Sequence, residues 1–153
     1  MPNFTFNPDW RHKEPRQPVN SHISHQRNGT MNQYDPKLAP NPDEWLELDE
    51  QERILLVEQH HRLARDKLPN LTAHAIFHTI VENQIALNLE PVVRAMTRLT
   101  KEGLTRHDAV HAIASVVAEH IYDLFNTNDG PNTSQTRYNA AVERLNAKNW
   151  RGG

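Results

Sequence analysis

The chain has 153 residues, of which 37% are apolar, and this length suits one domain with a single core. Its formal net charge of −2 gives no electrostatic reason to expect nucleic acid or an anionic membrane surface as a partner. The lack of cysteine excludes disulfides, thiolate metal ligands and a cysteine nucleophile, which leaves histidine and carboxylate as metal ligands.

Residues 1–42 are predicted to form a disordered arm. They hold seven of the ten prolines, and no helical or strand period persists through them. In one interpretation the aromatic residues Phe4, Phe6 and Trp10 bind a protein partner, and in the other this segment is a loose leader. No apolar run is long enough to span a bilayer or to form the core of a signal peptide, so we expect a cytoplasmic protein.

Organised structure is predicted over residues 43–125. Asp43 is placed to cap a short turn, and Asp49 forms a capping box with Glu52 at the start of a helix over about 50–67. The sequence at 69–70, Pro-Asn, ends that helix. A second helix follows over about 72–87, with an apolar stripe that includes Phe77 and Val81.

Two further helices complete the predicted domain. Pro91 suits the first turn of the third helix, and Gly103 suits the position just after its end. Thr105 then caps the fourth helix, with Asp108 three residues later, and the apolar stripe of that helix reaches Leu124. Four helices joined by short connections predict an all-α fold, most simply an antiparallel four-helix bundle.

The C-terminal part is predicted to add one short helix. Residues 126–136 have the composition of a linker, and residues 137–153 are read as a short helix with a tail. Ser134 is placed to cap this helix over about 135–148, with Tyr138 and Val142 on one face. Because so short a helix is marginal alone, it must pack on the domain or on a protein partner.

The most informative pattern is a repeated pair of histidines. His74 and His78, and then His107 and His111, are spaced i, i+4, so each pair shares one helix face. If the second and fourth helices of the bundle point the same way, the two pairs lie at matching heights. The competing interpretation is that these imidazoles border the core and serve only the fold.

The first helix offers further ligands near its end. Glu58 and His61 have the Glu-x-x-His spacing that di-iron bundle proteins use, although the helical wheel places His60 nearer to the core than His61. Glu119 on the fourth helix is another candidate carboxylate. The predicted metal ligands are therefore His74, His78, His107, His111, Glu58, His61 and Glu119.

These residues resemble a known family. The two histidine pairs, followed by Gln84 and by Glu119, look like domain-of-unknown-function family 1841, a group of small bacterial proteins. The string Val-Glu-Asn-Gln at 81–84 and the string Arg-His-x-Ala at 106–109 also look like bacterial hypothetical domains. The resemblance covers a little over half of the chain. It implies a helical fold and a functional histidine cluster, and it implies no reaction.

The leading hypothesis is a binding site for a transition metal, with zinc or iron first among the candidates. Four histidines would close a structural site, three with an open position would suit hydrolysis, and six ligands from three helices would suit two irons. A His-Asp phosphohydrolase fits poorly because Asp108 lies where a helix cap belongs. The alternative is a non-catalytic protein-interaction module with a structural histidine cluster, binding through the arm or the last helix.

Overall fold

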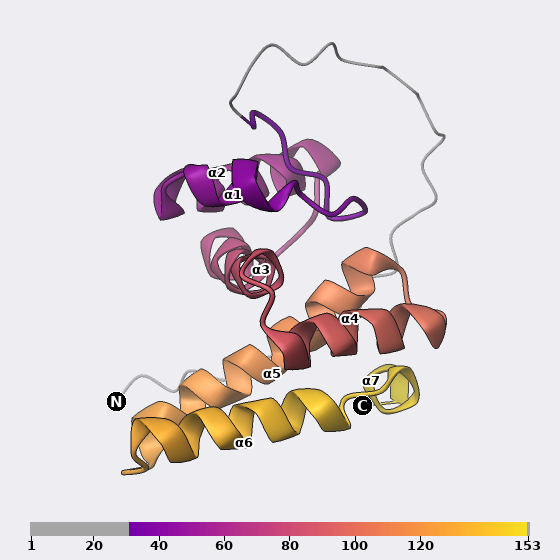
Figure 1. Ribbon diagram of the computed structural model, residues 1–153. Coiled ribbons are helices and arrows are strands. Elements are labelled where there is room, and N and C mark those ends of the chain that lie inside the picture. The colour runs from indigo at the N-terminus through magenta and orange to yellow at the C-terminus, as the bar shows by residue number, and fades with distance from the viewer. Residues whose placement is uncertain (1–30, 153) are drawn as a thin grey trace.

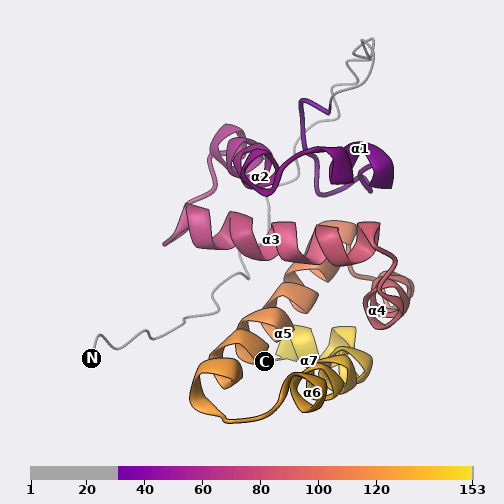
Figure 2. The same ribbon diagram turned by 60° about the vertical axis from the view of Figure 1, so that its left-hand side comes forward.

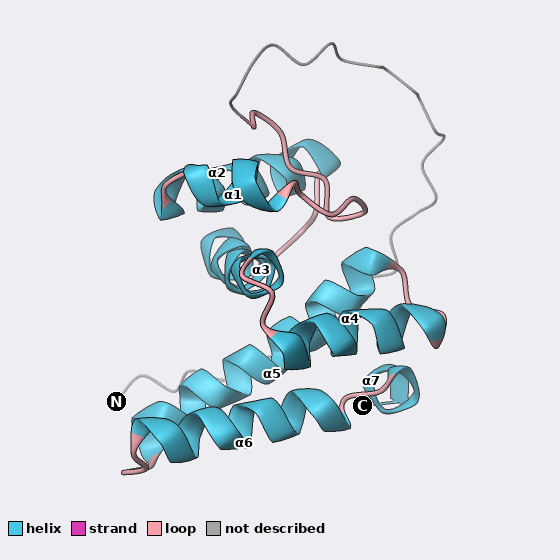
Figure 3. Ribbon diagram, in the orientation of Figure 1, coloured by secondary structure: helices cyan, strands magenta, loops and turns pink. Residues whose placement is uncertain are grey.

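The computed structural model describes residues 31–152, and this part of the chain is helical without a strand (Figure 1, Figure 3). The prediction of an all-α fold is confirmed. No helix in the described part combines the length and the apolar character needed to cross a membrane. The helices are α1 (Pro42–Glu47), α2 (Glu50–Ala64), α3 (Leu71–Ala86), α4 (Glu90–Lys101), α5 (Arg106–Asn126), α6 (Pro131–Arg144) and α7 (Ala147–Gly152).

Helix α3 lies in the middle of the molecule. In Figure 1 it is seen nearly end-on, with α1 and α2 on one side and α4 and α5 on the other. Figure 2 shows α3 from the side, with α5 crossing it steeply. The packed pairs agree with this view, because α1, α2 and α5 all contact α3, while α6 packs on α4 and α5.

The antiparallel four-helix bundle is not confirmed, and the composition of α5 explains why. Every residue from Ala109 to Ala114 is buried, which is more than one full helical turn. A helix that is apolar all round must be covered on all sides. Helices α3, α4 and α6 provide that cover. Helix α6 is thereby part of the core, with Tyr138 and Val142 buried.

Most helix ends follow the predicted chemistry. The Asp49 carboxylate accepts from the backbone N–H of Glu52 at 2.8 Å, and the Glu52 carboxylate accepts from the N–H of Asp49 at 2.9 Å. Thr105 caps α5 by accepting from the N–H of Asp108 at 3.0 Å. Gly103 follows α4 with a φ of 94°, a backbone conformation that favours glycine.

Several predicted boundaries are wrong. Asn41 caps α1 in place of Asp43, and α2 ends at Ala64 because Arg65 turns into the left-handed region with a φ of 58°. Helix α6 begins at Pro131, whose missing N–H costs nothing in a first turn, so residues 131–136 of the predicted linker are helical. Ser134 is consequently buried inside α6 and does not cap it.

The described segment before α1, residues 31–41, packs on the helices. Tyr34 in this segment is only 4% exposed and belongs to a small apolar cluster with Trp45, Leu48, Val57 and Ala75. This part of the predicted arm therefore folds against α1, α2 and α3. Residues 1–30, with the aromatic anchors predicted there, lie outside the described residues.

The burial of α5 on every side predicts that shortening a side chain there costs more stability than shortening an exposed one. Ile113 is fully buried in α5, whereas Leu63 on α2 is 75% exposed. We expect Ile113→Ala to lower the free energy of unfolding by about 2–5 kcal/mol and Leu63→Ala to lower it by less than about 0.5 kcal/mol. Urea unfolding of the two variants measures this difference, and equal losses of unfolding free energy would contradict the burial of α5 on every side.

Candidate metal centre

Five histidines meet where α2, α3 and α5 come together. His61 lies in the last turn of α2, His74 and His78 lie in the first two turns of α3, and His107 and His111 begin α5. None of the five is more than 9% exposed. The i, i+4 spacing that the sequence displays is what turns both pairs of α3 and α5 toward one place.

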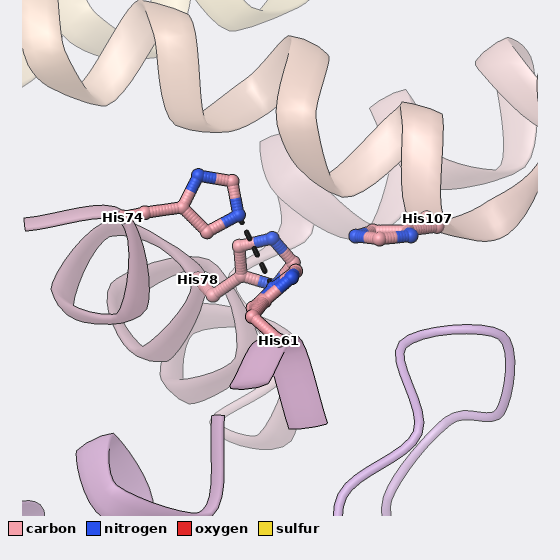
Figure 4. A group of neighbouring side chains, drawn as sticks. All are labelled: His61, His74, His78 and His107. Carbon is pink, nitrogen blue, oxygen red and sulfur yellow. Dashed lines mark hydrogen bonds between the residues drawn. The ribbon is translucent and has the colours of Figure 1, made fainter. Parts of the chain in front are cut away.

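Four of these imidazoles are close enough to share one ion (Figure 4). His61, His74, His78 and His107 each offer a ring nitrogen, and these four atoms all lie within 4.8 Å of one another. Nε2 of His61 and Nε2 of His74 are 3.2 Å apart. Two nitrogens bound to one tetrahedral zinc ion would be about 3.3 Å apart, because each Zn–N bond is about 2.0–2.1 Å. This contact is a hydrogen bond between the two imidazoles, and its length is also close to the spacing of two zinc ligands.

His111 is the fifth member of the cluster. Its ring centroid lies 4.3 Å from that of His107, 4.8 Å from that of His78 and 5.0 Å from that of His74. It therefore stands next to three of the four gathered histidines. An ion among these rings would lie beside a fifth imidazole.

Hydrogen bonds at one ring nitrogen fix the orientation and the tautomer of two of the histidines. Nδ1 of His61 lies 2.7 Å from the Asp66 carboxylate, so Nδ1 carries the hydrogen and Nε2 keeps its lone pair. Nδ1 of His78 lies 3.2 Å from the Tyr34 hydroxyl oxygen. That hydroxyl donates its own hydrogen to Glu82 at 2.6 Å, so it accepts from His78.

The inner nitrogen of His78 is the most telling atom of the cluster. His78 is fully buried, and its Nε2 has no hydrogen-bond partner within the described part of the chain. With the hydrogen on Nδ1, this Nε2 carries the lone pair, and the His78 ring lies among the other imidazoles (Figure 4). Ligand histidines typically donate their outer N–H in this way, which orients the ring and leaves the inner nitrogen for a metal.

Burial disfavours the charged form of four of the histidines. The pKa of His74 falls to about 3 because burial disfavours the charged ring and because His61 is close. The pKa of His107 also falls to about 3, for the same two reasons. Burial, together with neighbouring imidazoles, holds the pKa of His78 and that of His111 well below the ordinary value. Neutral imidazole is the form that binds metal.

The predicted carboxylate ligands are not brought into the cluster. Glu58 is buried, but its oxygens accept hydrogen bonds from Thr72 at 2.7 Å and from Arg62 at 3.2 Å. Glu119 is exposed, and eight residues of helix place it about 12 Å along α5 from His111. A carboxylate-bridged pair of irons, which needs such ligands, is therefore not supported by this arrangement.

The order of the two histidines in α2 is the reverse of the prediction. His61 is 1% exposed, whereas His60 is only half-buried. The buried residues of α2 are Val57, Glu58 and His61. Two of them are polar, so the apolar residues of this helix do not indicate which face is buried. Asp66 and Tyr34 were also missed, because neither lies in a recognisable motif and only the fold brings them to the rings.

The lowered pKa values predict acid instability of the metal-free protein. The unfolded chain, with histidine pKa values near 6.5, binds protons more tightly than the folded one. Stability is therefore complete above pH 6.5 and is lost as the pH falls toward 3. At pH 5, His74 and His107 should each lower the free energy of unfolding by about 2 kcal/mol relative to its value above pH 6.5.

Urea unfolding in chelator at pH 7, 6 and 5 measures this slope. The double variant His74→Gln, His107→Gln should show a shallower slope, because glutamine does not titrate. A stability that stays level between pH 7 and pH 5 would contradict the burial of uncharged histidines.

Comparison with known proteins leaves the function to be argued from this geometry. No family model, no curated protein and no solved structure matches the chain. The resemblance to domain-of-unknown-function family 1841 accordingly stays a prediction. What the geometry establishes is a buried cluster of histidines, four of which are able to hold a metal ion.

Proposed function

We propose that this protein binds one transition-metal ion through His61, His74, His78 and His107. The observation that carries the proposal is the gathering of four ring nitrogens, from three helices, within 4.8 Å of one another. Neutral nitrogen ligands suit zinc, iron, nickel and copper, and they suit magnesium and calcium poorly. Zinc is the first candidate, since it favours four ligands in a tetrahedron.

A metal accounts for the cluster better than a purely structural role does. A structural imidazole in a core is expected to hydrogen-bond through its ring nitrogens, and a buried polar atom without a partner costs about 1–3 kcal/mol. Nε2 of His78 has no such partner among the described residues, although its Nδ1 is bonded. A metal ion bound to Nε2 of His78 would give this buried atom a partner and remove the cost.

The burial of the site favours a structural or ion-holding role over catalysis. All five histidines are covered, so a substrate would reach the ion only if the surrounding segments moved. The ion would instead join three helices. Described contacts between α2 and α5 are made by imidazoles, with the His107 ring centroid 5.6 Å from that of His61 and 6.2 Å from that of His60. An ion here would link α2 directly to α5.

Zinc titration of untagged protein against a chromophoric chelator tests the proposal. We expect about one equivalent to bind, and His78→Ala to weaken binding by about 100-fold or more, which exceeds the effect typical of outer-shell residues. His120→Ala is the matched control, because His120 lies on α5 next to Ser134 and outside the cluster. Its affinity for zinc should equal that of the wild type.

Two results would overturn the proposal. One is folded wild-type protein that retains none of zinc, iron, nickel or copper after each ion has been supplied. The other is an equal loss of zinc affinity in His78→Ala and His120→Ala, which would show that binding does not involve the cluster.

Metal removal should also change stability. An ion that binds only the folded chain stabilises it by about 2.7 kcal/mol when the free ion is at 100 times its Kd. We therefore expect chelator to lower the Tm of the wild type and to leave the Tm of His78→Ala unchanged. Thermal unfolding with and without chelator measures both, and an unchanged wild-type Tm would contradict a bound ion.

A further inference from the structure

The segment of residues 31–41, drawn in indigo before α1 in Figure 1, contacts the histidine cluster through Tyr34. We call it the strap. Tyr34 is its buried anchor, with its ring centroid 6.1 Å from the ring of His78 and 6.1 Å from the ring of His60. Pro36 is also buried, and its carbonyl accepts from Arg106 at 2.9 Å. Most other residues of the strap are exposed.

A chain of hydrogen bonds connects the strap to α3 and α5, two of the three helices that carry the cluster histidines. Arg106, next to His107 in α5, holds the Glu82 carboxylate through two bonds of 2.8 Å. Glu82 lies one turn after His78 in α3 and accepts from the Tyr34 hydroxyl. Tyr34 in turn accepts from Nδ1 of His78.

The direction of these bonds is well defined. Because the Glu82 carboxylate only accepts hydrogen bonds, the Tyr34 hydroxyl donates its hydrogen to Glu82 at 2.6 Å. The oxygen of Tyr34 is then available only as an acceptor for His78. This contact selects the form of His78 whose Nε2 has a lone pair for a metal.

We propose that Tyr34 is a positioning residue of the metal centre and that metal binding and closure of the strap are one coupled event. The inference rests on the proposed function. A cation on Nε2 of His78 withdraws electron density from the ring, so Nδ1–H becomes a stronger donor to Tyr34. The coupling is reciprocal: what holds Tyr34 in place also favours the ion.

The strap is suited to such a role because two buried residues, Tyr34 and Pro36, anchor it and most of its other residues are exposed. It contains no helix, and the backbone bond from Leu38 N–H to the Asp35 carbonyl at 3.0 Å closes its one turn. Segments with few buried contacts open at the lowest cost in free energy. Without the ion, Nδ1–H of His78 is a weaker donor to Tyr34, and the strap loses part of its anchorage.

The test compares two tyrosines. Tyr34 and Tyr138 are 4% and 3% exposed, and each hydroxyl donates to a side-chain oxygen at 2.6 Å. Replacing either by phenylalanine removes one buried hydroxyl and keeps the ring, but only Tyr34 contacts a cluster histidine. We expect Tyr34→Phe to weaken zinc binding about 10–100-fold, the range for outer-shell partners, and Tyr138→Phe to leave it unchanged.

A second readout follows the strap itself. Hydrogen exchange at the amides of Lys37 and Leu38 should slow when zinc binds the wild type, because closure protects the turn. In Tyr34→Phe the same amides should respond to zinc much less, while in Tyr138→Phe they should respond as in the wild type. Thermal unfolding of both variants establishes that each is folded during the comparison.

The outcomes separate this inference from the proposed function. If the wild type binds no zinc, both the proposed function and this inference are wrong. If the wild type binds zinc and Tyr34→Phe binds it equally well, the proposed function stands and Tyr34 has no positioning role. If zinc leaves the exchange of the strap unchanged in the wild type, the coupled closure is wrong.

Discussion

The burial of five imidazoles between α2, α3 and α5 is the constraint on which the rest of this structure depends. Proteins rarely bury several titratable side chains against one another, because each charged form is excluded and each ring nitrogen needs a partner. Here the outer nitrogens of His61 and His78 bond to Asp66 and to Tyr34, and the inner nitrogens gather. A fold that tolerates this arrangement without an ion does so at a cost in stability.

The apolar parts of the molecule are arranged around this cluster. The larger apolar cluster is built on α5 with α3, α4 and α6, and the smaller one joins the strap, α1 and α2 to α3. Helix α3 contributes to both, with Val81 in the first and Ala75 in the second. The histidines meet where α2 approaches α5, so an ion among them would connect the two clusters more directly than α3 alone does.

Local chemistry made part of this fold predictable, and tertiary packing decided the rest. Side-chain caps such as Asp49 and Thr105 act within one turn, so the sequence predicted them, and the i, i+4 spacing predicted the shared faces of the histidine pairs. The antiparallel bundle is not confirmed, because burial on every side of α5 depends on which helices cover it. His61, Glu119 and Tyr34 show the same limit: orientation around α2, distance along α5 and the path of the strap are set by packing, and no motif records them.

X-ray absorption spectroscopy of the zinc-loaded wild-type protein tests the central claim most directly, because it reports the atoms bound to the ion. The proposed site requires a first shell of nitrogen at about 2.0–2.1 Å, with the outer-shell scattering of at least four imidazoles. A first shell dominated by oxygen, or the signature of no more than two imidazoles, would show that the ion binds elsewhere and that the buried histidines are not its ligands.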